Sequence, residues 1–512
     1  MRADRPAFAR PSGPVPSPAT APWLVARHRP VLLGLAVAVV ALAVGALAPS
    51  HLEYALAVLA AGALVAAVLV RPMVGVVLLV GLVPVTSGLA AGLPVPRVRL
   101  SEVLIGLVGV TLIASVRRRD AVPWQPVDWA LLAYGGCWLV FGVLAERTLG
   151  QHLALTDWGT VLGQFQFFLV YRAVRVAVRT TAERRLAVGT VLLSSLAVSG
   201  LALLQEVRVP GVSSFVTTLT GGIVTGGIAG AGSPVTRATG PFDNWAALAG
   251  YLLPIVLVLV ACAFAGVRSR HRGWFVAAGA LAAVALFVTD EQSAIICLLV
   301  GVVVLARHYT RGRHLMRWVA GGIAVAVAVA APLLVARLAN ELAGAAGTGR
   351  VSWVPQTLSF RWSVWVHQYL PAIGARPLSG YGVLLPTSVH WPYPESQYVS
   401  FLMEGGVLML VAFAVLTWAM LEGTRRASRS SDPLTGALGR ALTVAVVSMV
   451  VMNATWPFLS NGGLPQVLWA LMALTVPGAL REGEVLHSPS RAVQGAPSPG
   501  EETKSPVPGM AR

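Results

Sequence analysis

The chain has 512 residues, of which 56% are hydrophobic and only 12% are charged, and its mean hydropathy is +0.73. Soluble proteins carry about 25% charged residues, so this composition excludes a water-soluble globular enzyme, a disordered protein and a secreted disulfide scaffold. The apolar residues suffice for about fourteen spans of ~20 residues, and such segments satisfy their backbone polar groups in lipid as helices. The composition therefore predicts an all-α polytopic membrane protein.

Neither the charge nor the cysteines of this chain point to a partner or cofactor. The formal net charge of +17 does not indicate nucleic acid, because the basic residues follow the membrane topology. Only Lys504 of the 38 basic residues is a lysine. The preference for arginine is therefore a property of the whole composition, and it does not mark any single arginine as functional. Each of Cys137, Cys262 and Cys297 lies inside an apolar run, which indicates core packing and neither a disulfide framework nor a metal site. We expect no cofactor.

The two ends of the chain are predicted to be disordered cytoplasmic tails. Residues 1–30 are rich in Pro, Ala and Arg, and residues 481–512 are polar and rich in Pro and Ser. The first apolar run, 31–48, ends on Ala-Leu-Ala and so resembles a signal peptide with its cleavage site. The long preceding tail and the many following spans favour a retained first helix. The transmembrane domain then covers residues 31–480.

Apolar segments between these tails predict about fourteen transmembrane helices, with twelve or thirteen as the alternative. They are residues 31–48, 54–70, 72–92, 101–116, 127–145, 153–171, 186–205, 245–266, 274–289, 292–306, 316–336, 400–421, 439–455 and 465–480. With the N-terminus inside, 29 of the 38 basic residues fall on the cytoplasmic side and nine fall outside. This excess is what the positive-inside rule requires, so both termini are predicted to be cytoplasmic.

Two predicted outer segments are too long to be simple connections. One is residues 206–244, and the other is residues 337–399, the only sizeable hydrophilic stretch between spans. Long structureless loops are usually functional, so we expect the active site on the outer face, mainly in 337–399. Within it an apolar stripe at helical spacing predicts an amphipathic helix over 356–370 at the outer leaflet, with Arg361 beside the stripe. The stripe consists of Leu358, Trp362, Trp365 and Tyr369. An interfacial anchor without chemistry is the alternative.

Two further stretches follow this helix. In residues 375–382 (ARPLSGYG) two glycines bracket Tyr381, which a simple loop turn also explains. In residues 390–406 (HWPYPESQYVSFLMEGG), Glu395 and Tyr398 lie where the loop becomes a span, and Glu404 enters the apolar region. An ionisable group there is a functional candidate, although a salt bridge to an outer arginine explains it too.

The outer-face residues together suit a lipid-linked diphosphate. Arg237, Arg361 and Arg376 are predicted to line a cavity at the membrane edge, and guanidinium forks bind phosphate oxygens bidentately. If the diphosphate is the leaving group of a sugar, these arginines would stabilise its developing charge. A nearby carboxylate or His390 would take the proton of the incoming hydroxyl. None of the usual metal-binding motifs is present in the sequence.

The order of these features resembles the O-antigen ligase and polymerase superfamily of bacterial surface-polysaccharide synthesis. The resemblance covers roughly residues 155–475, and three stretches carry it. They are Arg237-Ala-Thr-Gly-Pro-Phe242 with Ala249-Gly-Tyr-Leu252, then Arg361, Trp365 and Pro377-Leu-Ser-Gly-Tyr-Gly382, then Tyr398 with Glu404-Gly405-Gly406. Two departures exist. Glu395 and Ser396 stand where ligases carry His-Asn, and Glu291-Gln292 stands where a Ser-Arg pair is common, which favours a polymerase or a divergent member.

The resemblance implies a GT-C-like membrane glycosyltransferase of the bacterial inner (cytoplasmic) membrane. It would move glycan from an undecaprenyl-diphosphate donor to a glycan or lipid acceptor on the outer face, without a metal. Arg237 and Arg361 would hold the diphosphate, with Arg376 as a weaker third. Glu395 or His390 would orient or deprotonate the acceptor hydroxyl. Tyr398 and Glu404 would contribute to substrate binding.

Several rival functions fit the sequence less well. A lipid-linked oligosaccharide flippase or another transporter should carry charge at the bilayer midplane, whereas the ionisable groups here gather at the outer edge. A glycan polymerase of the shape-and-division family should have about ten spans, and a metal-dependent lipid-phosphate-sugar transferase should show early acidic pairs. A purely structural membrane protein is the remaining alternative.

Overall fold

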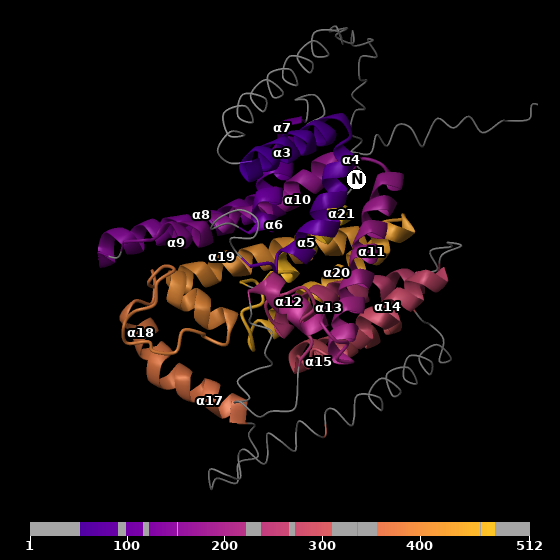
Figure 1. Ribbon diagram of the computed structural model, residues 1–512. Helices are drawn as coiled ribbons and strands as arrows, with labels where there is room; N and C mark the ends of the chain where they lie inside the picture. Colours follow the sequence, from indigo (N-terminus) through magenta and orange to yellow (C-terminus); the bar gives the residue numbers. More distant parts are fainter. Residues whose placement is uncertain are drawn as a thin grey trace, which may run out of the picture.

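A computed structural model gives the fold of the chain. It describes residues 52–90, 99–115, 122–150, 152–221, 237–265, 272–309, 335, 356–460 and 462–476, and over these residues the secondary structure is helical, without a strand. Figure 1 shows the helices gathered into one bundle, with the segment that carries α17 and α18 projecting from one side. The predicted tails 1–30 and 481–512 lie outside the described residues.

Several helices follow one another without a break, such as α4, η1 and α5, or α6, η2 and α7. The N-terminal half contains α3 (Leu52–Val70), α4 (Pro72–Val77), η1 (Leu78–Leu82), α5 (Val83–Thr86), α6 (Leu100–Leu104), η2 (Ile105–Gly109), α7 (Val110–Ser115), α8 (Pro126–Leu149), α9 (Leu155–Gly163), α10 (Phe165–Ala177), α11 (Thr181–Glu206) and α12 (Val212–Thr220). The C-terminal half contains α13 (Trp245–Phe264), α14 (Arg272–Phe287), α15 (Gln292–Tyr309), α17 (Gln356–Val364), η4 (Trp365–Tyr369), α18 (Leu370–Ala375), α19 (Gln397–Ser428), α20 (Pro433–Met452) and α21 (Leu464–Thr475).

These helices make the chain a multi-pass membrane protein. Six of them are long and apolar enough to cross a membrane, or seven if residues 54–86, bent by 119° at Arg71, form one broken span. Most predicted spans coincide with a helix or a helix pair, but several of these helices are too short to span by themselves. The predicted spans 31–48 and 316–336 lie outside the described residues. The count of about fourteen spans therefore stays a prediction.

Helix α13 is the centre of the bundle and positions the site. It is buried along most of its length and packs against α14, α15, α20 and α21. Its N-terminus is fixed by Asn244, whose side-chain oxygen accepts a hydrogen bond of 2.7 Å from the backbone N–H of Ala247. Because Arg237 precedes this start by only a few residues, the most buried of the candidate membrane spans orients the segment that carries it.

Buried charges connect the helices near the N-terminus of α8. Asp128, in the first turn of α8, is fully buried and pairs with both Arg172 and Arg175 of α10. The Arg172 guanidinium also lies over the Trp124 ring, 5.0 Å from its centroid. Arg184 of α11 likewise bonds to Asp432 and Thr435 at the start of α20. Buried charges are costly unless they are paired, so these contacts fix how the helices meet.

Helix α19 is broken at Gly405 and Gly406, and a loop is bonded to its backbone there. Gly406 has φ +62° and ψ −156°, a conformation that L side chains rarely adopt. The loop 377–382 bonds to the freed backbone, because Tyr381 donates to Met403, Gly382 donates to Glu404 and Val407 donates to Pro377. The two glycine-containing stretches noted in the sequence are therefore one structural unit, and a simple loop turn does not describe it.

The helix predicted over 356–370 is present as the continuous run α17, η4 and α18. Its apolar stripe does not share one environment, however. Leu358 and Trp362 are 50% and 64% exposed, whereas Tyr369 is fully buried with Ile373 against the rest of the loop. Half of the predicted stripe is thus the core of the loop segment, and only its first part is open to a membrane interface.

Candidate functional site

The first element of the site is an ion pair between Arg361 of α17 and Glu395, which precedes α19. The Nη2 atom of Arg361 lies 3.1 Å from the Glu395 carboxylate, and its Nε donates to the same oxygen at 3.2 Å. Glu395 is only 3% exposed, and the Arg361 side chain is 24% exposed. A buried carboxylate is therefore joined to a cation that is still accessible from outside.

The second element is a similar ion pair, between Arg237 before α13 and Asp290 before α15. Arg237 lies 3.3 Å from the carboxylate of Asp290, which is buried in the turn between α14 and α15. Its guanidinium also lies over the ring of Trp245, 4.7 Å from the centroid. The segment behind Arg237 is fixed by Gln205, whose side-chain oxygen accepts hydrogen bonds from Thr239 and Gly240 at 3.0 and 3.1 Å.

Glu291, the neighbour of Asp290, interacts electrostatically with both arginines. It accepts a hydrogen bond of 2.7 Å from the hydroxyl of Ser293. Burial raises the pKa of Glu291, while Arg237 and Arg361 both act to lower it, which puts both guanidiniums within electrostatic reach of one carboxyl group. Burial also raises the pKa of Glu395, opposed by Arg361 and reinforced by Glu291. We call these five residues, Arg237, Asp290, Glu291, Arg361 and Glu395, the arginine–carboxylate cluster.

Both ion-paired acids sit on unusual backbone. Asp290 has φ +54° and Glu395 has φ +56°, in the left-handed region that few residues other than glycine adopt. Each lies just before the helix that follows it, α15 or α19. A strained backbone persists only where the surroundings impose it, and such residues gather at functional sites.

Aromatic side chains fix the loop that carries Glu395. The Trp365 indole N–H donates to the carbonyl of Pro394 at 2.6 Å, and the Tyr369 hydroxyl donates to the carbonyl of Trp391 at 2.6 Å. The side-chain oxygen of Gln368 accepts from the backbone N–H groups of His390 and Trp391, each at 3.0 Å. Residues 390–395 are therefore bound along η4, which explains how Glu395 is brought to Arg361.

The other predicted site residues lie apart from this cluster. Arg376 donates to Thr148 at the end of α8 and lies over the Tyr381 ring. His390 is exposed, and its backbone N–H donates a hydrogen bond to the side chain of Gln368. The Tyr398 hydroxyl donates to the carbonyl of Val450 at 2.6 Å. Glu404 lies at the break of α19, where one of its carboxylate oxygens is buried without a hydrogen-bond partner among the described residues.

Sequence reasoning missed Asp290, Trp245 and the place of Glu291. The signal was present, because Asp290 and Glu291 form an acidic pair in the short turn between two apolar runs. Acids that separate two predicted spans on the same face as Arg237 are candidates for ion pairing with it. Over the described parts of the chain, no group of three or more His, Cys, Asp or Glu side chains is arranged to hold a metal ion.

The family model of the O-antigen ligases matches residues 277–414. This segment is similar to the O-antigen ligases. The resemblance to the O-antigen ligase and polymerase superfamily is thereby confirmed. The matched segment includes Asp290, Glu291, Arg361 and Glu395, which are four of the five cluster residues, and Arg237 lies upstream of it. No curated protein matches the chain significantly.

Proposed function

We propose that this protein transfers glycan from an undecaprenyl-diphosphate donor to an acceptor hydroxyl on the outer face of the bacterial inner membrane. The match to the O-antigen ligases supports a membrane glycosyltransferase of polysaccharide synthesis. One observation carries the finer proposal: Arg237 and Arg361 come from segments far apart in the sequence and both lie within electrostatic reach of Glu291.

The two guanidiniums would bind the diphosphate of the donor. Each guanidinium has five N–H donors in a planar fork, a geometry that binds phosphate oxygens bidentately. The carboxylates hold the arginines in place before the ligand arrives, so little conformational freedom is lost on binding. Because burial raises the pKa of Glu291, this group adds less negative charge to the cluster than an exposed carboxylate would.

Glu395 would act as the general base. The acceptor oxygen attacks the anomeric carbon of the donor sugar and its proton passes to Glu395, while the bond to the diphosphate breaks and its electron pair stays on the diphosphate oxygen. A base works best when its pKa lies near the operating pH, and burial raises the pKa of Glu395 in that direction. His390 is the less favoured base, because it is exposed and lies outside the cluster.

The first part of the loop helix would face lipid beside this site. Leu358 and Trp362 are half exposed or more, and Trp side chains favour the interface between lipid and water. Arg361 lies on the same helix between Leu358 and Trp362. A donor whose tail lies in the bilayer and whose head lies in water would there meet an apolar surface for its tail and a guanidinium for its diphosphate.

The proposal is tested with purified protein in vesicles that contain a lipid-diphosphate oligosaccharide. We expect longer glycans or a glycosylated acceptor together with one released lipid diphosphate per transfer, and loss of this activity in Glu395→Gln. Retained activity in that variant with loss in His390→Ala would move the base to His390. Movement of labelled lipid across the bilayer without any transfer would contradict the proposal and favour a flippase.

A further inference from the structure

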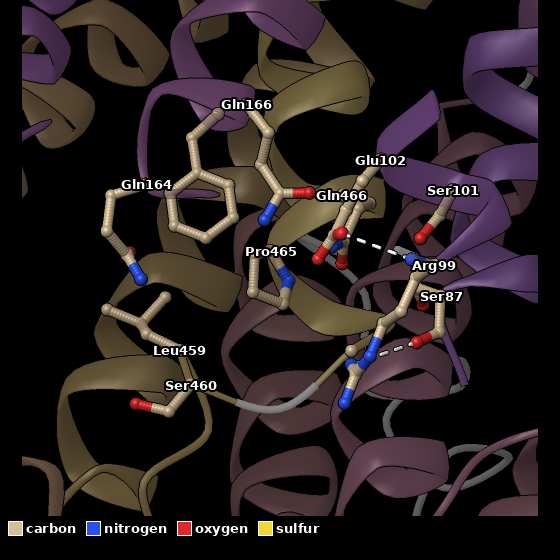
Figure 2. A pocket seen from close by; sticks show the side chains of 12 residues that line it. Ser87, Arg99, Ser101, Glu102, Gln164, Gln166, Leu459, Ser460, Pro465 and Gln466 are labelled. Atoms are coloured by element: carbon tan, nitrogen blue, oxygen red, sulfur yellow. Dashed lines mark hydrogen bonds between the residues drawn. The ribbon is translucent and has the colours of Figure 1, made fainter. Parts of the chain in front are cut away.

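A second polar site lies beside the arginine–carboxylate cluster. Figure 2 shows an open cavity lined almost wholly by polar groups, with the Gln166 amide directed into its centre. Its polar lining comprises Ser87, Arg99, Ser101, Glu102, Gln164, Gln166, Ser460 and Gln466. In a chain with so few polar residues, a group of hydroxyls and amides drawn from four separate segments needs an explanation.

The cavity lies where two consecutive helices of the membrane domain, α9 and α10, meet. The apolar run predicted to span over 153–171 divides into α9 and α10, and Gln164 lies at the break. Gln164 keeps a right-handed helical backbone, with φ −67° and ψ −25°. Polar side chains at such a position are tolerated where they line a cavity or are buried in protein. The break therefore places Gln164 and Gln166 at the cavity, together with the residues that precede α21.

The lining suits an uncharged ligand that is rich in hydroxyl groups. Arg99 and Glu102 supply one charge of each sign. Burial raises the pKa of the nearby Asp243 carboxyl group, and Arg99 partly opposes this rise. The Arg99 guanidinium already donates to the carbonyl of Ser87 at 3.3 Å. The side-chain oxygen of Gln166 is buried and has no hydrogen-bond partner among the described residues. A buried acceptor without a donor is costly, so a ligand hydroxyl there would gain a ready partner.

Two short segments, residues 395–397 and 243–245, contact residues of the cavity lining and also contribute to or contact the arginine–carboxylate cluster. Gln397, two residues after Glu395, donates to the hydroxyl of Ser460 at 3.2 Å and accepts from the N–H of Leu459 at 3.0 Å. On the other side, Asp243 interacts with Arg99, while Trp245 lies against Arg237. The same two segments thus contact the cavity and the cluster, so a glycan could reach from one to the other.

We infer that this cavity binds a neutral sugar residue of the glycan substrate, next to the position where the sugar is transferred. The inference rests on the proposed function for the identity of the substrate. A lining without net charge, made of amides and hydroxyls, fits a sugar, whereas a diphosphate would need an excess of cationic groups. The sugar belongs either to the acceptor glycan or to the distal part of the donor.

The test measures binding of a lipid-free, uncharged oligosaccharide, released from the cell's own surface polysaccharide, by isothermal titration calorimetry on the purified full chain. We expect Gln166→Leu and Gln164→Leu each to weaken binding by roughly tenfold, the loss of about one well-made hydrogen bond. Gln125→Leu, at the far end of α8, is the matched control and should bind like the wild type. Arg361→Gln should also bind the sugar normally, which makes this readout independent of donor binding and of transfer.

A kinetic arm identifies the source of the sugar. A higher KM for the acceptor in Gln166→Leu, with the donor KM unchanged, assigns the cavity to the acceptor glycan, and the reverse assigns it to the donor. Unchanged binding in both variants, with monodisperse protein of normal thermal stability, would overturn the inference. Normal sugar binding without any transfer would leave the cavity in place and reject the proposed function.

Discussion

The carboxylate of Glu395 lies 3.1 Å from the guanidinium of Arg361, although 33 residues separate them in the chain. Glu395 sits on left-handed backbone at φ +56°, and the loop before it is bound along η4 through Trp365 and Tyr369. The surroundings therefore impose this ion pair on the loop. A preorganised cation beside a buried base is the arrangement on which the proposed transfer depends.

The transfer rate should fall as the pH is lowered, with a midpoint above the ordinary pKa of glutamate. Burial raises the pKa of Glu395, and a general base must be ionised, so activity is present above this raised pKa and is lost below it. The measurement is kcat/KM against pH. In Glu395→Gln the acidic limb should disappear along with most of the activity. A wild-type midpoint at or below the ordinary value of about 4.5 would speak against Glu395 as the base.

Glu291 should make stability depend on pH. Its pKa is raised by burial in the folded chain, so the folded state binds more protons than the unfolded state between the two pKa values. The free energy of unfolding is therefore highest below the unfolded value of about 4.5 and falls as pH rises through the raised folded pKa. Thermal unfolding in detergent across this range should show a shallower pH dependence in Glu291→Gln than in the wild type. Equal slopes would contradict the burial of this carboxyl group.

Gly406→Ala should destabilise the protein and detach the loop 377–382 from α19. A Cβ on Gly406 would meet the carbonyl carbon of Leu378 at 2.4 Å, and its φ of +62° is unfavourable for alanine. Such backbone strain costs about 1–3 kcal/mol before the clash is counted. Gly200→Ala in α11 is the control, because its Cβ has no neighbour within 4 Å. Similar melting temperatures for the two variants would argue against the described docking.

Asp128→Asn should be strongly destabilising without changing the substrate affinity of the chain that does fold. Removing this charge leaves Arg172 and Arg175 buried beside a neutral group, which typically costs about 3–5 kcal/mol. The exposed pair of Glu422 and Arg426 on α19 is the comparison, and Glu422→Gln should cost no more than about 0.5 kcal/mol. Thermal unfolding of both variants in detergent measures the difference. A small effect at Asp128 would mean that its ion pairs with Arg172 and Arg175 do not hold α8 to α10.

The sequence alone predicts an all-helical membrane protein, because long apolar segments are typical of membrane helices, but the predicted count of about fourteen spans is not confirmed. It also predicts Arg361 and Glu395 as site residues, since both lie in the polar loop. It does not reveal Asp290 and Trp245, whose roles depend on which helix ends meet in space. Helical spacing identified the stripe of the loop helix, but spacing cannot distinguish a side chain facing lipid, such as Trp362, from one that packs inside the loop, such as Tyr369.

The most direct test of the central claim is the affinity of the purified protein for undecaprenyl diphosphate. We predict that Arg237→Gln and Arg361→Gln each weaken binding by at least about tenfold, since hydrogen bonds to a charged group contribute about 1.5–3 kcal/mol. Arg425→Gln, exposed at the far end of α19, should bind like the wild type. Affinities that are unchanged in both site variants, or reduced equally in all three, would contradict the account.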